Sequence, residues 1–97
     1  MAAAPIRAVF TGSGVWDAWR VEGLDGEHLF TVRLMIHASG NGEYLVLAPG
    51  DALLHEGSFR FDAWDEATAS GLVTGILAEQ RPGAPVTLDS GKRPPRP

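Results

Sequence analysis

The sequence contains no cysteine. Disulfide bonds, thiolate metal sites, iron–sulfur clusters and a cysteine nucleophile are therefore excluded. It also lacks any run of about 18 apolar residues, the length that a membrane-spanning helix requires. Residues 1–7 show no charged region followed by an apolar run of signal-peptide length, so we expect a cytoplasmic protein with no membrane partner.

Positive charge is scarce. Eight Lys and Arg residues stand against twelve Asp and Glu residues, which gives a formal net charge of −4. Three of the basic residues, Lys92, Arg93 and Arg96, lie close together in a proline-rich tail, so the remaining chain is more acidic still. An acidic surface repels phosphate and disfavours nucleic-acid binding. With 97 residues, of which 44% are apolar, the chain has the length and composition of one small globular domain.

Short apolar-rich segments alternate with turn residues through the first 61 residues, which predicts β-strands. We expect strands at residues 6–10, 15–22, 28–37, 44–47 and 53–61. The third of these has the clearest alternation, with one apolar face formed by Phe30, Val32, Leu34 and Ile36. We expect this face to be buried beneath a helix. Asp25-Gly26 before it is a strong hairpin signal.

The hydrophobic period then changes to that of a helix, which we expect over residues 62–81. Asp62 is a suitable N-cap, and Arg81 suits the negative end of the helix dipole. Pro82-Gly83 ends the helix. The sequence therefore predicts an α+β fold, with a four- or five-stranded, mostly antiparallel sheet (a β-meander) and one C-terminal helix packed on one face.

Residues 1–81 form the single predicted domain, and residues 82–97 form a proline-rich, basic, flexible tail. Within that tail, the alternative for residues 86–88 (Val-Thr-Leu) is a short edge strand. The layout is similar to that of many small bacterial and phage proteins, among them inhibitors, immunity proteins and antitoxin-like factors. No motif assigns the chain to any one of them.

A stripe of small residues follows the predicted helix at a spacing of four: Ala67, Gly71 and Gly75. Each glycine inside a helix costs about 1 kcal/mol relative to alanine, so the missing side chains are expected to have a use. They would let another backbone or an aromatic ring approach. The neighbour is either a segment of the same chain, such as the tail or a tryptophan, or a partner protein.

Trp16 and Trp19 fall on opposite faces of one predicted strand, which would leave one of them exposed to solvent. An exposed tryptophan is a common binding anchor. Core burial is the alternative for each, because a small domain needs large apolar side chains to fill its core. The candidate partner-binding residues are thus Trp16, Trp19, Ala67, Gly71 and Gly75.

The sequence shows no residue pattern that is typical of a catalytic site or a metal-binding site. His28, His37 and His55 lack the spacing of metal ligands. Ser13, between Gly12 and Gly14, forms neither a nucleophile elbow nor a phosphate loop. We expect no cofactor and no enzyme activity.

The sequence favours a small non-catalytic protein-binding module of a regulatory or inhibitory kind, with a protein partner or a second copy. The alternative is a ligand-binding or enzymatic domain whose cleft forms across a homodimer interface.

Overall fold

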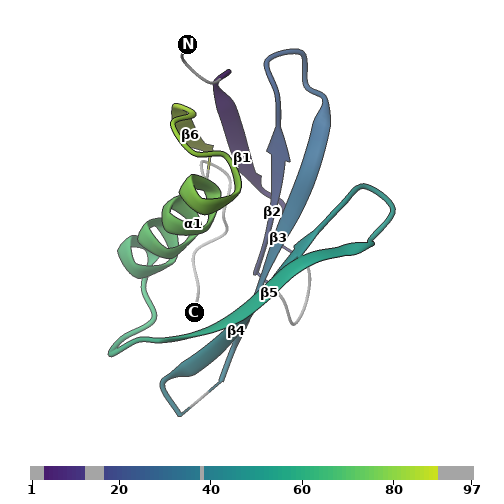
Figure 1. The fold of residues 1–97 in the computed structure, drawn as a ribbon. Coiled ribbons are helices and arrows are strands. Elements are labelled where there is room, and N and C mark those ends of the chain that lie inside the picture. Colours follow the sequence, from purple (N-terminus) through teal and green to yellow (C-terminus); the bar gives the residue numbers. More distant parts are fainter. Residues whose placement is uncertain (1–3, 13–16, 38, 90–97) are drawn as a thin grey trace.

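The structure is a computed structural model that describes residues 4–12, 17–37 and 39–89. In this part of the chain six strands form one sheet, and one helix packs against a face of that sheet (Figure 1). The elements are β1 (Ile6–Phe10), β2 (Asp17–Glu22), β3 (His28–Ile36), β4 (Asn41–Leu47), β5 (Leu53–Arg60), α1 (Glu66–Gln80) and β6 (Val86–Asp89). The α+β class is the predicted one, and the described residues contain no helix with the length and hydrophobicity to cross a membrane.

The strands lie in the order β5-β4-β3-β2-β1-β6. Strands β1 to β5 form the predicted antiparallel meander. The sheet is nevertheless larger than predicted and is mixed, because β6 pairs in parallel with β1, from Ile6 opposite Val86 to Val9 opposite Asp89. The chain passes along α1 and returns to the outer edge of β1, where Ile6 N–H donates to Pro85 O at 2.9 Å. The short edge strand left open at residues 86–88 is therefore present as β6, within the segment that the prolines predict to be a flexible tail; residues 90–97 lie outside the described residues.

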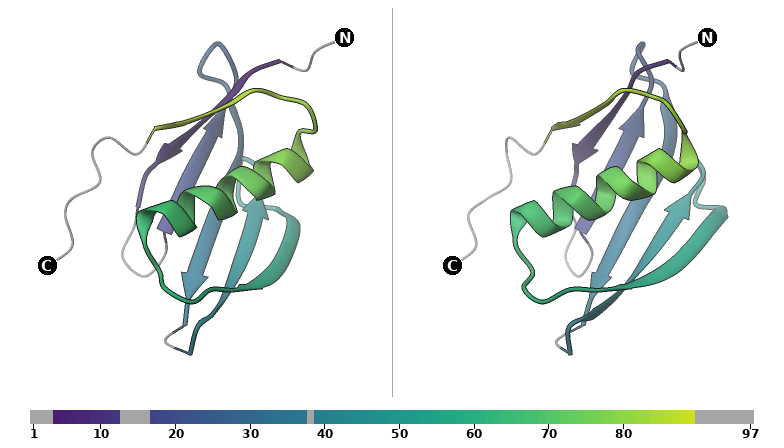
Figure 2. Two further views of the ribbon diagram at one scale, coloured as in Figure 1. Left: turned by 90° about the vertical axis from the view of Figure 1, so that its left-hand side faces the viewer. Right: turned by 60° about the vertical axis from the view of Figure 1, so that its left-hand side comes forward.

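The core lies between α1 and the face of the sheet that it covers (Figure 2). The predicted apolar face of β3 is confirmed at Phe30, Val32 and Leu34, which are buried. Ile36 is half-buried and packs against the core; it is the last residue of β3 and lies opposite Gly42, which has no side chain to cover it. The helix contributes Ala69, Val73, Ile76 and Leu77 as its buried residues.

The N-terminus of α1 is later than predicted. Asp65, not Asp62, is the N-cap: its Oδ1 accepts a hydrogen bond from Thr68 N–H at 2.7 Å. This hydrogen bond holds the pKa of the Asp65 carboxyl below its ordinary value. At the other end, Arg81 N–H donates to Leu77 O at 2.8 Å.

An aromatic cluster explains why the segment before Asp65 is not helical. Trp64 stacks on Phe59, with ring centroids 5.8 Å apart, and meets Phe61 edge-on at 5.2 Å. Phe59 belongs to β5, so these contacts bind the connection to the sheet before the helix begins. Aromatic pairs of this kind contribute about 0.5–1.5 kcal/mol beyond the area that they bury.

Candidate protein-interaction surface

Of the two candidate tryptophans, Trp19 is in the core. It is 1% exposed and meets Phe10 edge-on, with ring centroids 5.1 Å apart. It therefore cannot act as an exposed anchor, because its place on β2 turns it toward α1, opposite Val32 of β3. Trp16 lies outside the described residues.

The small-residue stripe lies on the exposed side of α1. Ala67, Gly71 and Gly75 are all exposed. A Cβ atom added at Gly71 or Gly75 would meet nothing within 4 Å outside the helix's own nearby backbone. No described segment therefore packs into the stripe. Of the two neighbours considered, the one from the same chain is not found among the described residues. The two glycines lie away from the sheet, as predicted.

Replacing both Gly71 and Gly75 with alanine should stabilise the protein by up to about 2 kcal/mol, because helix propensity improves and no neighbour clashes. Urea unfolding would measure the change. Gly83→Ala is the matched control: the space around Gly83 is equally open, but its φ of +79° disfavours a side chain, so this variant should be destabilised. A destabilised Gly71→Ala/Gly75→Ala variant would show that a further segment occupies the stripe.

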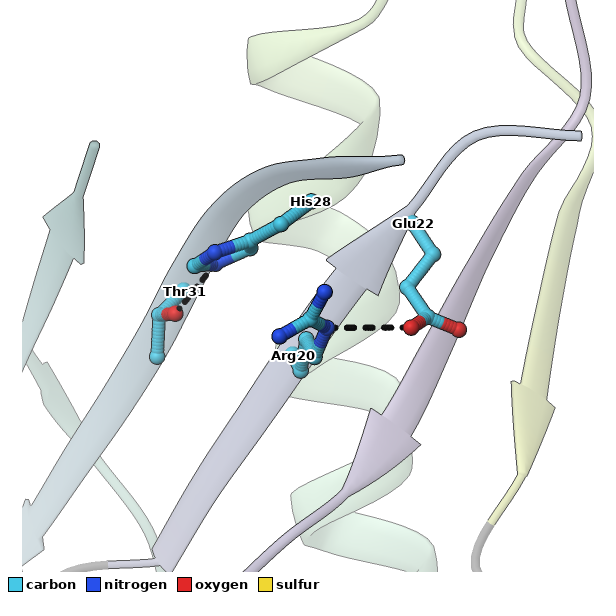
Figure 3. Close-up of polar contacts among 4 residues, drawn as sticks. All are labelled: Arg20, Glu22, His28 and Thr31. Carbon is cyan, nitrogen blue, oxygen red and sulfur yellow. Dashed lines mark hydrogen bonds and ion pairs between the residues drawn. The ribbon is translucent and has the colours of Figure 1, made fainter. Parts of the chain in front are cut away.

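The sheet face opposite α1 carries two polar pairs at the end of β2 and β3 (Figure 3). Arg20 Nε donates to Glu22 Oε2 at 3.0 Å, and His28 Nε2 lies 2.9 Å from Thr31 Oγ1. Strand register places Arg20 opposite Thr31. These groups bond one another and remain partly exposed, and ion pairs in such places contribute at most about 1 kcal/mol. These two contacts explain why polar residues gather at this place, and no ligand is needed to explain it.

The three histidines are kept apart by the sheet. His28 faces away from α1 with Thr31, whereas His55 Nε2 lies 3.1 Å from Tyr44 Oη on β4. His37 follows β3, and β4 separates β3 from the strand that carries His55. Among the residues that the structure describes, no three His, Asp or Glu side chains gather as metal ligands.

The strongest candidate surface is the outer edge of β5, which no described strand covers. Most of its side chains are exposed, and Leu53 and Leu54 remain 54% and 56% exposed. A shallow depression of about 630 Å³ runs between β4 and β5 beside this edge and includes Glu43, Ser58 and Arg60 in its lining. The backbone and the side chains of β5 are thus accessible together.

Backbone hydrogen bonding shows which groups point outward from β5. Phe61 N–H donates to Gly40 O at 3.0 Å, which makes these two residues a hydrogen-bonded pair in the β4–β5 register. Hydrogen-bonded pairs alternate along an antiparallel ladder. The backbone groups of Glu56, Ser58 and Arg60 consequently point away from β4, toward the open edge.

Strand β5 itself was predicted, but its place at the edge of the sheet was not. The local sequence carries a signal of this place: the strand contains a glycine, Gly57, and two charged residues, Glu56 and Arg60. Charged residues of this kind are common on edge strands. Tyr44 compensates for the missing side chain, since a Cβ at Gly57 would lie 2.6 Å from the Tyr44 ring.

Comparisons with models of protein families, with curated proteins and with solved structures found no match.

Proposed function

We propose that this chain is a non-catalytic protein-binding module that uses the outer edge of β5 as its contact surface. The observation that carries the proposal is an eight-residue edge strand whose backbone groups and two leucines are open to solvent. Long, exposed edges invite pairing with another chain, and proteins that do not use them generally shorten or cover them. Addition of a strand to such an edge is a recurring mode of protein recognition.

The polar surface supports binding rather than chemistry. Arg20, Glu22, His28 and Thr31, the residues of the polar pairs described above, satisfy one another. A module that binds a protein without altering it acts by occupying or holding that protein, which is a regulatory or inhibitory role.

Photo-crosslinking in the cells that make the protein tests this proposal. A benzophenone amino acid replaces Leu54, beside the β5 edge, or Leu24, in the turn between β2 and β3. Leu24 is the matched control because it is 76% exposed and remote from the edge in the strand order. We expect discrete protein adducts from position 54 and several-fold fewer from position 24. Equal labelling at both positions, or no adduct at either, would contradict the proposal.

A further inference from the structure

We propose that the edge of β5 binds a second copy of this chain, through antiparallel pairing of the two β5 strands about a twofold axis at Ser58. This inference rests on the proposed function and names the partner. It follows from the strand order, from the outward backbone groups and from the charges along β5.

The outward backbone groups restrict the register. Only residues whose N–H and C=O point to the open edge can form hydrogen-bonded pairs with a new strand. In the regular part of β5, after the register shift near its start, these are Glu56, Ser58 and Arg60, so this part of two β5 strands can pair only in registers that match members of this set. A twofold axis at Ser58 uses all three and gives about six backbone hydrogen bonds, since each such pair exchanges two.

Charge favours the axis at Ser58 over axes at Glu56 and at Arg60, and an axis midway between two of these residues pairs only two residues of each strand instead of three. With the axis at Ser58, Glu56 lies opposite Arg60 of the partner subunit, and symmetry repeats this pair. A shift that places the axis at Glu56 sets two carboxylates opposite each other, and an axis at Arg60 sets two guanidinium groups opposite each other. Opposite charges across a strand pair stabilise it and like charges destabilise it. Neither Glu56 nor Arg60 takes part in an ion pair within the described residues.

The face of the sheet toward α1 fits the same register. Gly57 would lie opposite Phe59 of the partner subunit as a non-hydrogen-bonded pair, in which side chains approach most closely. Glycine at this position leaves the pair without a clash between Cβ atoms, and the Phe59 ring stays over Gly42 and on Trp64 of its own subunit.

The paired state is one sheet that runs through both copies. A twofold axis through an antiparallel strand pair is perpendicular to the sheet, so α1 of each copy would lie on the same face. The connection after Arg60 leaves the strand toward Trp64, and the pairing therefore ends where β5 ends.

Sedimentation equilibrium of the purified full chain tests the pairing through charge exchange. The wild type should show a dimer of the 10.3 kDa chain, and Glu56→Arg or Arg60→Glu should each weaken it about tenfold or more at low salt. The double variant Glu56→Arg/Arg60→Glu should restore it. Glu27→Arg, in the exposed turn before β3, controls for the change in net charge and should leave the dimer intact.

A cysteine at the axis gives a second measurement. The chain has no cysteine of its own, so Ser58→Cys introduces a unique thiol. Paired Cα atoms at the axis would be about 5.5 Å apart, within reach of a disulfide. We expect rapid formation of a covalent dimer from Ser58→Cys and little from Glu56→Cys, which lies opposite residue 60.

A wild type that stays monomeric, together with equal crosslinking of the two cysteine variants, would overturn the self-pairing. The proposed function would still be decided separately, because Leu54 photo-crosslinks to a different protein would support it. Charge reversals that leave the wild-type dimer unchanged would place the dimer contact elsewhere and would also overturn the inference.

Discussion

Replacing Trp19 with alanine is expected to lower the free energy of unfolding by about 3–5 kcal/mol. Trp19 is the largest of the fully buried side chains and lies on β2 beneath α1. Its removal leaves a cavity between the helix and the sheet, which the close-packed surroundings can fill only in part. Urea-induced unfolding of the two proteins would measure the difference.

Trp19→Phe separates the packing contribution from the polar one. Trp19 Nε1 is buried without a hydrogen-bond acceptor among the described residues. An unpaired buried donor costs about 1–3 kcal/mol, so its removal offsets part of the packing lost with the larger ring. We expect Trp19→Phe to be clearly more stable than Trp19→Ala. Equal losses in the two variants would show that an aromatic ring at this position adds no packing energy, and a loss below 1 kcal/mol for Trp19→Ala would contradict the core assignment.

Gly42→Ala is the second variant with a large expected effect, a loss of about 1–3 kcal/mol. A Cβ atom at Gly42 would lie 2.2 Å from Phe59 Cζ and 2.9 Å from the backbone oxygen of Met35. The backbone of β3 cannot move without disturbing the ladder, and the Phe59 ring is held by its stack on Trp64. The variant should keep the fold but lower the urea midpoint.

Gly57→Ala is the control for this variant. The three heavy atoms nearest to its Cβ would all belong to the outer end of the Tyr44 side chain, at 2.6 Å, and this end can turn aside. We therefore expect a smaller loss than at Gly42, together with loss of the contact between Tyr44 Oη and His55. A larger loss at Gly57 than at Gly42 would contradict the packing described for β4 and β5.

Much of the sheet could be predicted from local pattern. The alternation in β3 identified its buried face, and the Asp25-Gly26 hairpin is present, with Gly26 at a φ of +77°. The strand expected at residues 44–47 begins earlier: the turn closes where His37 N–H donates to Asn41 O at 2.9 Å, and Asn41 already belongs to β4. Pairing with β3 and β5 thus extends β4 into residues that the sequence pattern left between two strands.

The missed features depend on contacts between distant parts of the chain. The pairing of β6 with β1 joins residues some eighty positions apart, so the hydrophobic pattern of neighbouring residues cannot predict it. Helix α1 begins later in the chain than predicted because Trp64 stacks on Phe59. For the same reason, sequence pattern placed Gly71 and Gly75 correctly away from the sheet but could not place β5 at its edge, which follows only from the order of all six strands.

The parallel pair of β1 and β6 also bears on biosynthesis. Strand β1 is synthesised before the four strands that follow it, yet its outer neighbour is Val86–Asp89, which is synthesised after all of them. A nascent chain that already contains β1 to β5 would therefore present open edges at both β1 and β5. Contacts of such long sequence separation slow folding and expose strand edges to misassembly. Synthesis of β6 closes one of these two edges, so the sheet has both edges open only in the interval between the synthesis of β5 and that of β6.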